Sequence, residues 1–227
     1  QSQLQNSDFA ILYRTNAQSR SFEDALRKKN ISYRVYGGLS FYQRKEIKDV
    51  LAYLRLLINP DDEQAFKRII NFPARGIGQT TLNKIAVEAK NCSVSDYIFI
   101  KDLLKSSEIL NNSTKNKLLD FVIMIESIKN KIEHADVFDI TKEVLKQSGL
   151  YNLYKNDESL EGINRIQNIE ELLNGIKDFV ENNEKSQASV SSFLQDVALA
   201  TDQDNDTNDN NKVSLMTVHL AKGLEFP

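Results

Sequence analysis

The segment from residue 75 to residue 81 has the composition of a loop that could hold a phosphate. It reads Arg75-Gly-Ile-Gly-Gln-Thr-Thr81 and lies between two stretches with helical spacing. Two glycines around one apolar residue let the backbone turn tightly, expose N–H groups and insert Ile77 into the core, while the next helix adds its positive end. The sequence predicts a helix-hairpin-helix clamp on a nucleic acid backbone, and the alternative is an ordinary glycine-capped turn. The clamp residues would be Arg75, Gly76, Ile77, Gly78, Thr80 and Thr81.

A second group of polar residues follows two strand-like segments that lie far apart in the sequence. Arg14 and Asn16 come after the apolar run at 9–13, and His219 and Lys222 come after the run at 213–218. Ligands of open α/β sheets bind at the carboxyl ends of strands, so neighbouring strands would place these side chains in one groove. Arginine and lysine would pair with phosphates, and Asn16, Thr217 and His219 could hydrogen-bond backbone or sugar. Taken singly, Arg14 could instead form a surface salt bridge and His219 could be a core histidine.

The sequence lacks the residues for a nucleotide phosphate-binding loop, a disulfide or a zinc site. The sequence contains no Gly-x-x-x-x-Gly-Lys-Ser/Thr loop to cradle nucleotide phosphates and place a magnesium ligand. Cys92 is the single cysteine, which excludes an intrachain disulfide and fits a reducing cytosol, and His134 and His219 are too isolated for a zinc cluster. We therefore expect no metal site and no ATP hydrolysis in this chain alone.

The elements that would position these residues alternate between strand and helix only at the two ends of the chain. Residues 9–13 and 31–36 favour strands, with helical spacing up to about Lys29 between them, and residues 213–218 favour a third strand. Residues 201–211 are acidic and polar, which is typical of a linker. Between residues 40 and 200 the pattern is helical, with helices expected at about 47–58, 63–71, 80–90, 94–105, 115–132, 137–148, 161–182 and 189–200.

Composition is that of a soluble globular protein with an uneven charge. Hydrophobic residues make up 41% and charged residues 27% of 227 residues, and no apolar run is long enough to cross a membrane, so we expect a cytoplasmic protein. Residues 1–90 hold 15 Lys+Arg against 9 Asp+Glu, whereas residues 91–227 hold 14 against 23. The basic front part indicates a local footprint for a polyanion, and a mixed solvated surface is the alternative.

Four segments, in this order and spacing, resemble motifs of the UvrD/PcrA/Rep family of superfamily 1 DNA helicases. They are Phe9-Ala-Ile-Leu-Tyr-Arg-Thr-Asn-Ala-Gln-Ser-Arg20, Gly37-Gly-Leu-Ser-Phe-Tyr-Gln-Arg-Lys-Glu-Ile-Lys-Asp49, Ile70-Asn-Phe-Pro-Ala-Arg-Gly-Ile-Gly78 and Leu215-Met-Thr-Val-His-Leu-Ala-Lys-Gly-Leu-Glu-Phe-Pro227. The resemblance covers the whole chain. Leu220 departs from the small Ser or Ala that is common in the family at that position.

The resemblance implies a mainly α fold, with an all-helical insertion attached to part of a RecA-like α/β layer. Residues 1–41 would begin the motor domain called 2A, residues 42–203 would form the helical domain 2B, and residues 204–227 would be a linker and a returning 2A strand. The chain would then be a fragment of an ATP-dependent 3′–5′ DNA helicase, which needs ATP and Mg²⁺ in its full-length form. Its 2B part would bind duplex DNA and regulate unwinding, or alternatively recruit repair or transcription proteins through an acidic helical face.

The resemblance also implies roles for single residues. Gly76, Ile77, Gly78 and Thr81 would hold duplex DNA together with Thr80, a position where some relatives carry Arg, and Arg44 and Lys45 would assist. Glu225 would approach the ribose of bound ATP. Single-stranded DNA would contact Arg14, Asn16, Thr217 and His219, with Lys222 nearby.

Overall fold

The two ends of the chain meet in one small parallel sheet. A computed structural model describes residues 4–184, 187–204 and 211–224. Its strands are β1 (Ala10–Tyr13), β2 (Tyr33–Val35) and β3 (Val213–Thr217), in the order β1-β3-β2 with both pairs parallel. The pairing of the first strand with the last confirms the expected neighbourhood of two distant segments.

Strand β1 lies at an edge of this sheet, which decides how far its side chains are covered. Tyr13 is buried, but Phe9 is 50% and Leu12 is 43% exposed. Phe9, just before the strand, and Leu12 within it stay partly uncovered because an edge strand has a neighbour on one side only. The central strand β3 does bury its apolar residues, Val213, Leu215 and Met216.

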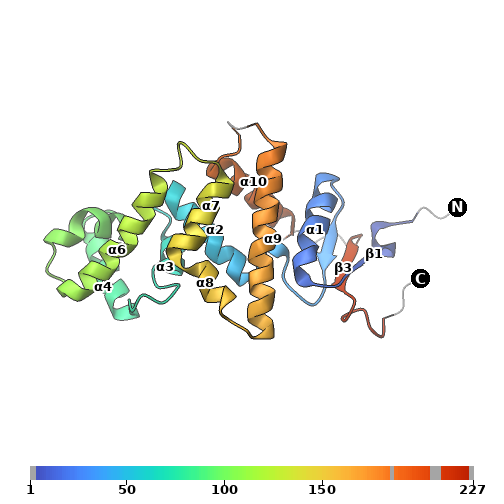
Figure 1. The fold of residues 1–227 in the computed structure, drawn as a ribbon, viewed down its shortest axis with the longest axis horizontal. Helices are drawn as coiled ribbons and strands as arrows, with labels where there is room; N and C mark the ends of the chain where they lie inside the picture. Colours follow the sequence, from blue (N-terminus) through green and yellow to red (C-terminus); the bar gives the residue numbers. More distant parts are fainter. Residues whose placement is uncertain (1–3, 185–186, 205–210, 225–227) are drawn as a thin grey trace.

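Helices joined by turns and loops make up the rest of the described chain (Figure 1). Helix α1 (Ser19–Lys28) connects β1 to β2, and α2 (Lys45–Ile58) begins the helical body after a short 3-10 turn, η3 (Phe41–Gln43). The body continues with α3 (Glu63–Ile69), α4 (Gln79–Asn91), α6 (Asn112–Lys129), α7 (Val137–Ser148), α8 (Leu150–Lys155), α9 (Leu160–Asn182) and α10 (Val190–Asp204). The mainly α fold with a small α/β layer agrees with the expectation.

Three local features differ from the sequence prediction. The helix expected at 94–105 is divided into α5 (Asp96–Ile98), the π-helical η4 (Phe99–Leu103) and the 3-10 turn η5 (Leu104–Ser106). Helix α8 was not predicted, because it follows α7 across a single residue, Gly149, whose φ of +82° ends α7. Helix α10 reaches Asp204, so residues 201–204 are helical where a linker was expected, and residues 205–210 lie outside the described part.

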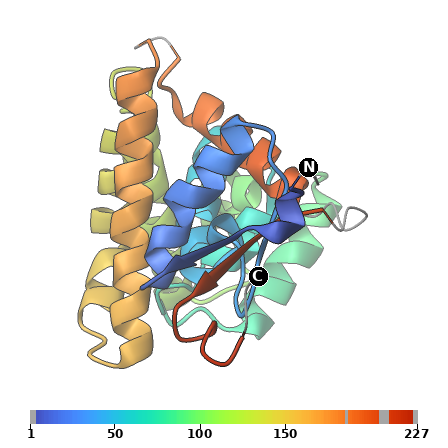
Figure 2. The same cartoon turned by 90° about the vertical axis from the view of Figure 1, so that its right-hand side faces the viewer.

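The hydrophobic core belongs to the helical body and leaves out the α/β layer. Its cluster of buried residues runs from Phe41 to Ala200 and contains no residue of α1 or of the three strands. The layer meets the body where α1 packs against α9 (Figure 1), and Figure 2, which looks onto this end of the molecule, shows α9 running beside α1. In the part of the chain that the structure describes, every helix is too short or too polar to span a lipid bilayer.

Candidate nucleic-acid interface

The loop between α3 and α4 has the backbone form that its glycines predict. Gly76 adopts a φ of +69°, in the left-handed region that favours glycine, and Gly78 is the residue that precedes the first turn of α4. Ile77 between them is 1% exposed, so it anchors the loop in the core as expected. Gly76, Gly78 and Thr80 are exposed, whereas Thr81 is half-buried.

The amide groups of this loop fall into two sets. The side-chain oxygen of Asn71 accepts hydrogen bonds from the backbone N–H of Arg75 at 2.9 Å and of Ile77 at 3.1 Å, so these two amides already have a partner. The amide of Thr81 bonds the carbonyl of Gly78. Among the described residues no partner exists for the remaining amides, those of Gly76, Gly78, Gln79 and Thr80.

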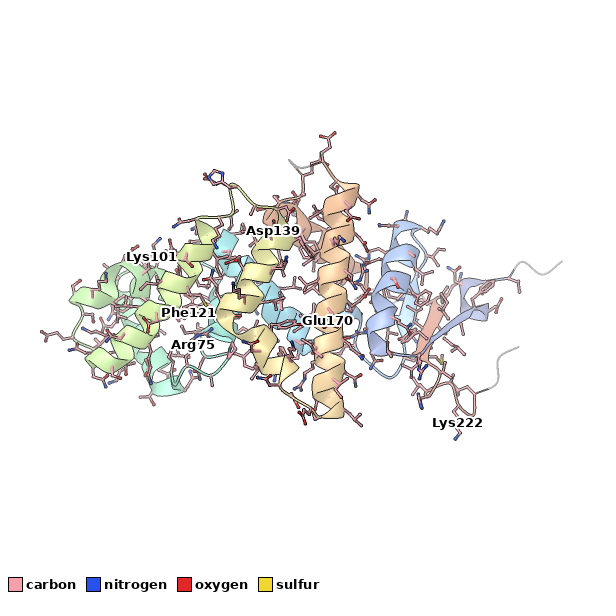
Figure 3. All side chains as sticks on the ribbon, in the orientation of Figure 1. Arg75, Lys101, Phe121, Asp139, Glu170 and Lys222 are labelled. Atoms are coloured by element: carbon pink, nitrogen blue, oxygen red, sulfur yellow. The ribbon has the colours of Figure 1, made fainter. Side chains whose placement is uncertain are left out.

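The Arg75 side chain points into the protein, in contrast with the phosphate contact that the sequence suggests. Its guanidinium donates to the carbonyls of Ile69 at 2.9 Å and Pro73 at 3.2 Å, and to the hydroxyl of Tyr53 at 2.7 Å. It also lies 5.2 Å from the ring centre of Phe121, and Figure 3 shows the two side chains next to each other. The carbonyls at the end of α3 need donors, and Arg75 supplies them. Its geometry is that of a residue that shapes the loop.

The Arg44 side chain is also engaged inside the protein. Its guanidinium is buried and donates to Asn168 of α9 at 2.9 Å and to Ser19 of α1 at 2.6 Å. Burial lowers the pKa of Arg44, while the nearby carboxylates of Glu23 and Glu46 act in the opposite direction. The expected assistance at duplex DNA is thus corrected, because Arg44 connects the α/β layer to the helical body.

The strand-end residues come together as predicted. Tyr13 is aligned with Thr217, and the amide of Val218 bonds the carbonyl of Tyr13 at 2.9 Å, which places the turn after β1 beside the turn after β3. The side-chain oxygen of Gln18 accepts from the amide of Arg14 at 2.9 Å and fixes the first turn. Thr217 is half-buried, and its hydroxyl accepts from the amide of Leu220 at 3.3 Å.

The four charged or polar side chains of this edge are available to solvent. Arg14, Asn16, His219 and Lys222 are all exposed, so the alternative of a core histidine at His219 is wrong. Within the described ranges Arg14 forms no ion pair. Glu225 lies outside the described residues. Figure 3 shows that Lys222 at this edge and Arg75 near the hairpin loop lie in opposite halves of the long axis.

Two residues next to the hairpin loop were not found from the sequence. Asn71, which accepts from the amides of Arg75 and Ile77, carried a detectable signal, because an Asn four residues before Arg75 can accept from loop amides. Lys117 on α6 lies so close to Gly76 that a Cβ added there would be 2.8 Å from its ammonium nitrogen. No spacing in the sequence could reveal this contact, since it depends on how α6 packs against the loop.

A parallel sheet whose strands are separated by a long helical body defines an α/β domain with an α-helical insertion. The chain belongs to the UvrD-like helicase C-terminal domain family, whose model matches residues 1–227. It is similar to ATP-dependent DNA helicase PcrA of Bacillus subtilis (strain 168), with 41% identity over 229 residues, 97% of this chain and 30% of the relative. The protein of the same name from Staphylococcus aureus (strain Mu50) is 40% identical over 222 residues. The chain thus spans about 30% of the length of these relatives.

Proposed function

We propose that this chain is part of an ATP-dependent 3′–5′ DNA helicase, in which the helical body grips duplex DNA by its backbone. Residues 42–203 would form this accessory domain, and residues 1–41 and 204–227 would belong to a motor domain. The names of the relatives support the helicase assignment, and the exposed amides of the hairpin loop support the duplex contact. Amides at a helix N-terminus bind phosphate oxygens without reading bases, which suits an enzyme that moves along any sequence.

The observation that carries this proposal is the open space in front of Gly78. Its φ of −89° and ψ of 165° are accessible to any residue, and a Cβ added there would meet nothing within 4 Å. The fold itself therefore does not require a glycine at this position. A side chain at Gly78 would, however, stand before the free amides of Gln79 and Thr80. We infer that the missing side chain allows a phosphate to approach, and duplex affinity of a Gly78→Asp variant tests this.

The edge formed by the two strand ends would contribute to a groove for single-stranded DNA. The exposed cations Arg14 and Lys222 suit phosphates, while Asn16 and His219 suit backbone or sugar atoms. The register of β1 and β3 brings the turns that carry these four residues to one edge of the sheet, which supports a shared groove. Glu225 would approach the ribose of ATP in the longer protein.

ATP and Mg²⁺ would be bound mainly by parts of the longer protein that this chain does not contain. The residues present do not fit the triphosphate, because the sequence has no phosphate-binding loop with its lysine and hydroxyl. We predict that the purified chain releases no phosphate from ATP, with or without single-stranded DNA. A phosphate-release assay checks this, and turnover that rises with DNA and persists through repeated purification would contradict it.

The junction between α1 and α9 suits a regulated movement of the helical body. Arg20 of α1 is 7% exposed and contacts Glu171 at 2.7 Å and Asp178 at 3.3 Å, both on α9. Burial acts to lower the pKa of Arg20, but the hydrogen bond with Glu171 and the charges of Asp24 and Glu171 raise it above its ordinary value. Polar interfaces of this kind commonly permit domain motion, whereas the apolar core stays within the body. We propose that rotation at this junction regulates unwinding.

Replacing Arg20 with glutamine should loosen this junction. The variant leaves the α9 carboxylates without their cation. We expect the free energy of unfolding to fall by about 1–3 kcal/mol, a moderate loss because water partly solvates these carboxylates. Two nitroxide labels, one on the exposed Cys92 and one on a Lys29→Cys substitution at the end of α1, report the distance between body and layer. The distribution of label-to-label distances should be broader in the Arg20→Gln variant than in the parent, in which Arg20 holds the junction.

The matched control is Arg165→Gln, which removes an ion pair with Glu161 inside α9 alone. It should leave the distance distribution unchanged. A distribution that stays equally narrow in the Arg20 variant would show that the ion pairs do not hold the junction.

A further inference from the structure

We propose that Lys117 is a second phosphate contact of the hairpin clamp, which extends the duplex footprint from the loop onto α6. This inference rests on the proposed duplex binding and adds a contact from a residue of another helix, 39 positions after Gly78 and 41 after Gly76. It concerns a side chain, whereas the clamp derived above consists of backbone amides. The two kinds of contact differ in how they respond to salt, so they can be tested separately.

The position of Lys117 is set by the packing of α6 beneath the loop. Phe121, one helical turn after Lys117, is 1% exposed and lies under the guanidinium of Arg75. Residues four apart share a helix face, so the Lys117 side chain rises along the same side, toward the loop. The ammonium nitrogen lies 2.8 Å from the place of a Cβ on Gly76. Lys117 and Arg75 also line the same surface cavity of about 350 Å³.

The positive charge at this place is not balanced by the protein. In the described part of the chain no carboxylate lies within 4 Å of the charged groups of Lys117 or Arg75, since neither takes part in an ion pair. Arg75 donates its hydrogen bonds to carbonyls and to the Tyr53 hydroxyl, which carry no charge. Asp120 lines the same cavity but forms no ion pair with Lys117. A phosphate diester would supply the missing negative charge beside the free amides of Gly76 and Gly78.

The charged ammonium of Lys117 would make duplex binding depend on salt, which neutral backbone amides do not. A neutral amide binds a phosphate oxygen but does not replace a condensed counterion, whereas each lysine that neutralises a phosphate releases about one counterion. The free amides would therefore set the geometry of the grip, and Lys117 would set much of its dependence on salt. Lysine suits this place because its compact charge on a flexible stem can follow a moving backbone.

The test compares Lys117→Gln with a control lysine on the same helix. Lys129 lies 12 residues further along α6, about 18 Å away, and has no ion pair in the described chain. Affinity for a fluorescein-labelled blunt DNA duplex is measured by anisotropy between 50 and 200 mM KCl. For Lys117→Gln we expect weaker binding and a slope of log affinity against log salt that is smaller by about 1. The ratio of parental to variant affinity should therefore fall about fourfold between 50 and 200 mM KCl. Lys129→Gln should match the parent, and Lys117→Arg should keep the slope.

The outcomes separate this inference from the proposed function. If Lys117→Gln keeps the parental slope and affinity while Gly78→Asp loses binding, the Lys117 contact is refuted and the amide clamp stands. If neither variant changes affinity, both proposals fail. Equal loss of slope in Lys117→Gln and Lys129→Gln would also refute the contact, because it would indicate a general effect of net charge. Thermal unfolding of each variant shows whether the fold is unchanged.

Discussion

Gly78→Asp is expected to weaken duplex DNA binding by about tenfold to a hundredfold without loss of the fold. The carboxylate would occupy the open space before the amides of Gln79 and Thr80, and it would repel the phosphate that those amides bind. Each hydrogen bond to a charged group is worth about 1.5–3 kcal/mol, which sets the size of the effect. Aspartate is a favourable residue before a helix, so the free energy of unfolding should stay equal or rise slightly. Anisotropy titration and thermal unfolding measure the two quantities.

The control for added charge is Ser159→Asp. Ser159 caps α9 by accepting from the amide of Gly162, so this variant places the same carboxylate at another helix N-terminus. It should bind duplex like the parent. Equal affinity of Gly78→Asp and the parent would contradict the clamp. It would then favour the alternative, in which the acidic helical face binds a protein partner, provided that substitutions on that face abolish partner binding.

Arg75→Ala is expected to destabilise the chain by about 2–4 kcal/mol. The guanidinium donates to the carbonyls of Ile69 and Pro73 and to the hydroxyl of Tyr53. Its removal takes from the Pro73 carbonyl its partner in the described chain, and one of two hydrogen bonds from each of the Ile69 carbonyl and the Tyr53 hydroxyl. The Phe121 ring also loses its covering cation. For a domain of this size the melting temperature should fall by roughly 5–15 °C. Chemical denaturation measures the free energy change directly.

The control for this prediction is Arg55→Ala. Arg55 is 48% exposed and forms one surface ion pair with Asp62, so its removal should cost no more than about 1 kcal/mol. If Arg75 instead contacted phosphate directly, Arg75→Ala would lose DNA affinity with little change in stability. That result would overturn the shaping role that the structure gives to this side chain.

The sequence predicted the features that depend on local pattern. Glycines around Ile77 indicated a tight loop with a buried anchor, and the apolar runs at the two ends indicated strands that pair. The helical stripe of α2 and the end of α7 at Gly149 were also predictable, because periodicity and a left-handed glycine are local signals.

The features that the sequence did not predict depend on where side chains point in the folded chain. Arg75 was expected at DNA because an arginine in a basic segment commonly binds phosphate, and Arg44 because of the family resemblance. In the fold, carbonyls of the loop engage Arg75 and a buried junction engages Arg44. Lys117 is near the loop only through packing of α6. His219 is exposed although a lone histidine in an apolar segment is often buried, because it lies in the turn after β3.

The most direct test of the duplex clamp is a titration of the ¹⁵N-labelled chain with a short DNA duplex, followed by amide shifts. The amides of Gly76, Gly78, Gln79 and Thr80 have no partner in the described chain, so they should shift strongly at low duplex concentration. Those of Arg75 and Ile77, held by Asn71, should shift less. Saturable shifts that leave the four free amides unmoved would contradict the account.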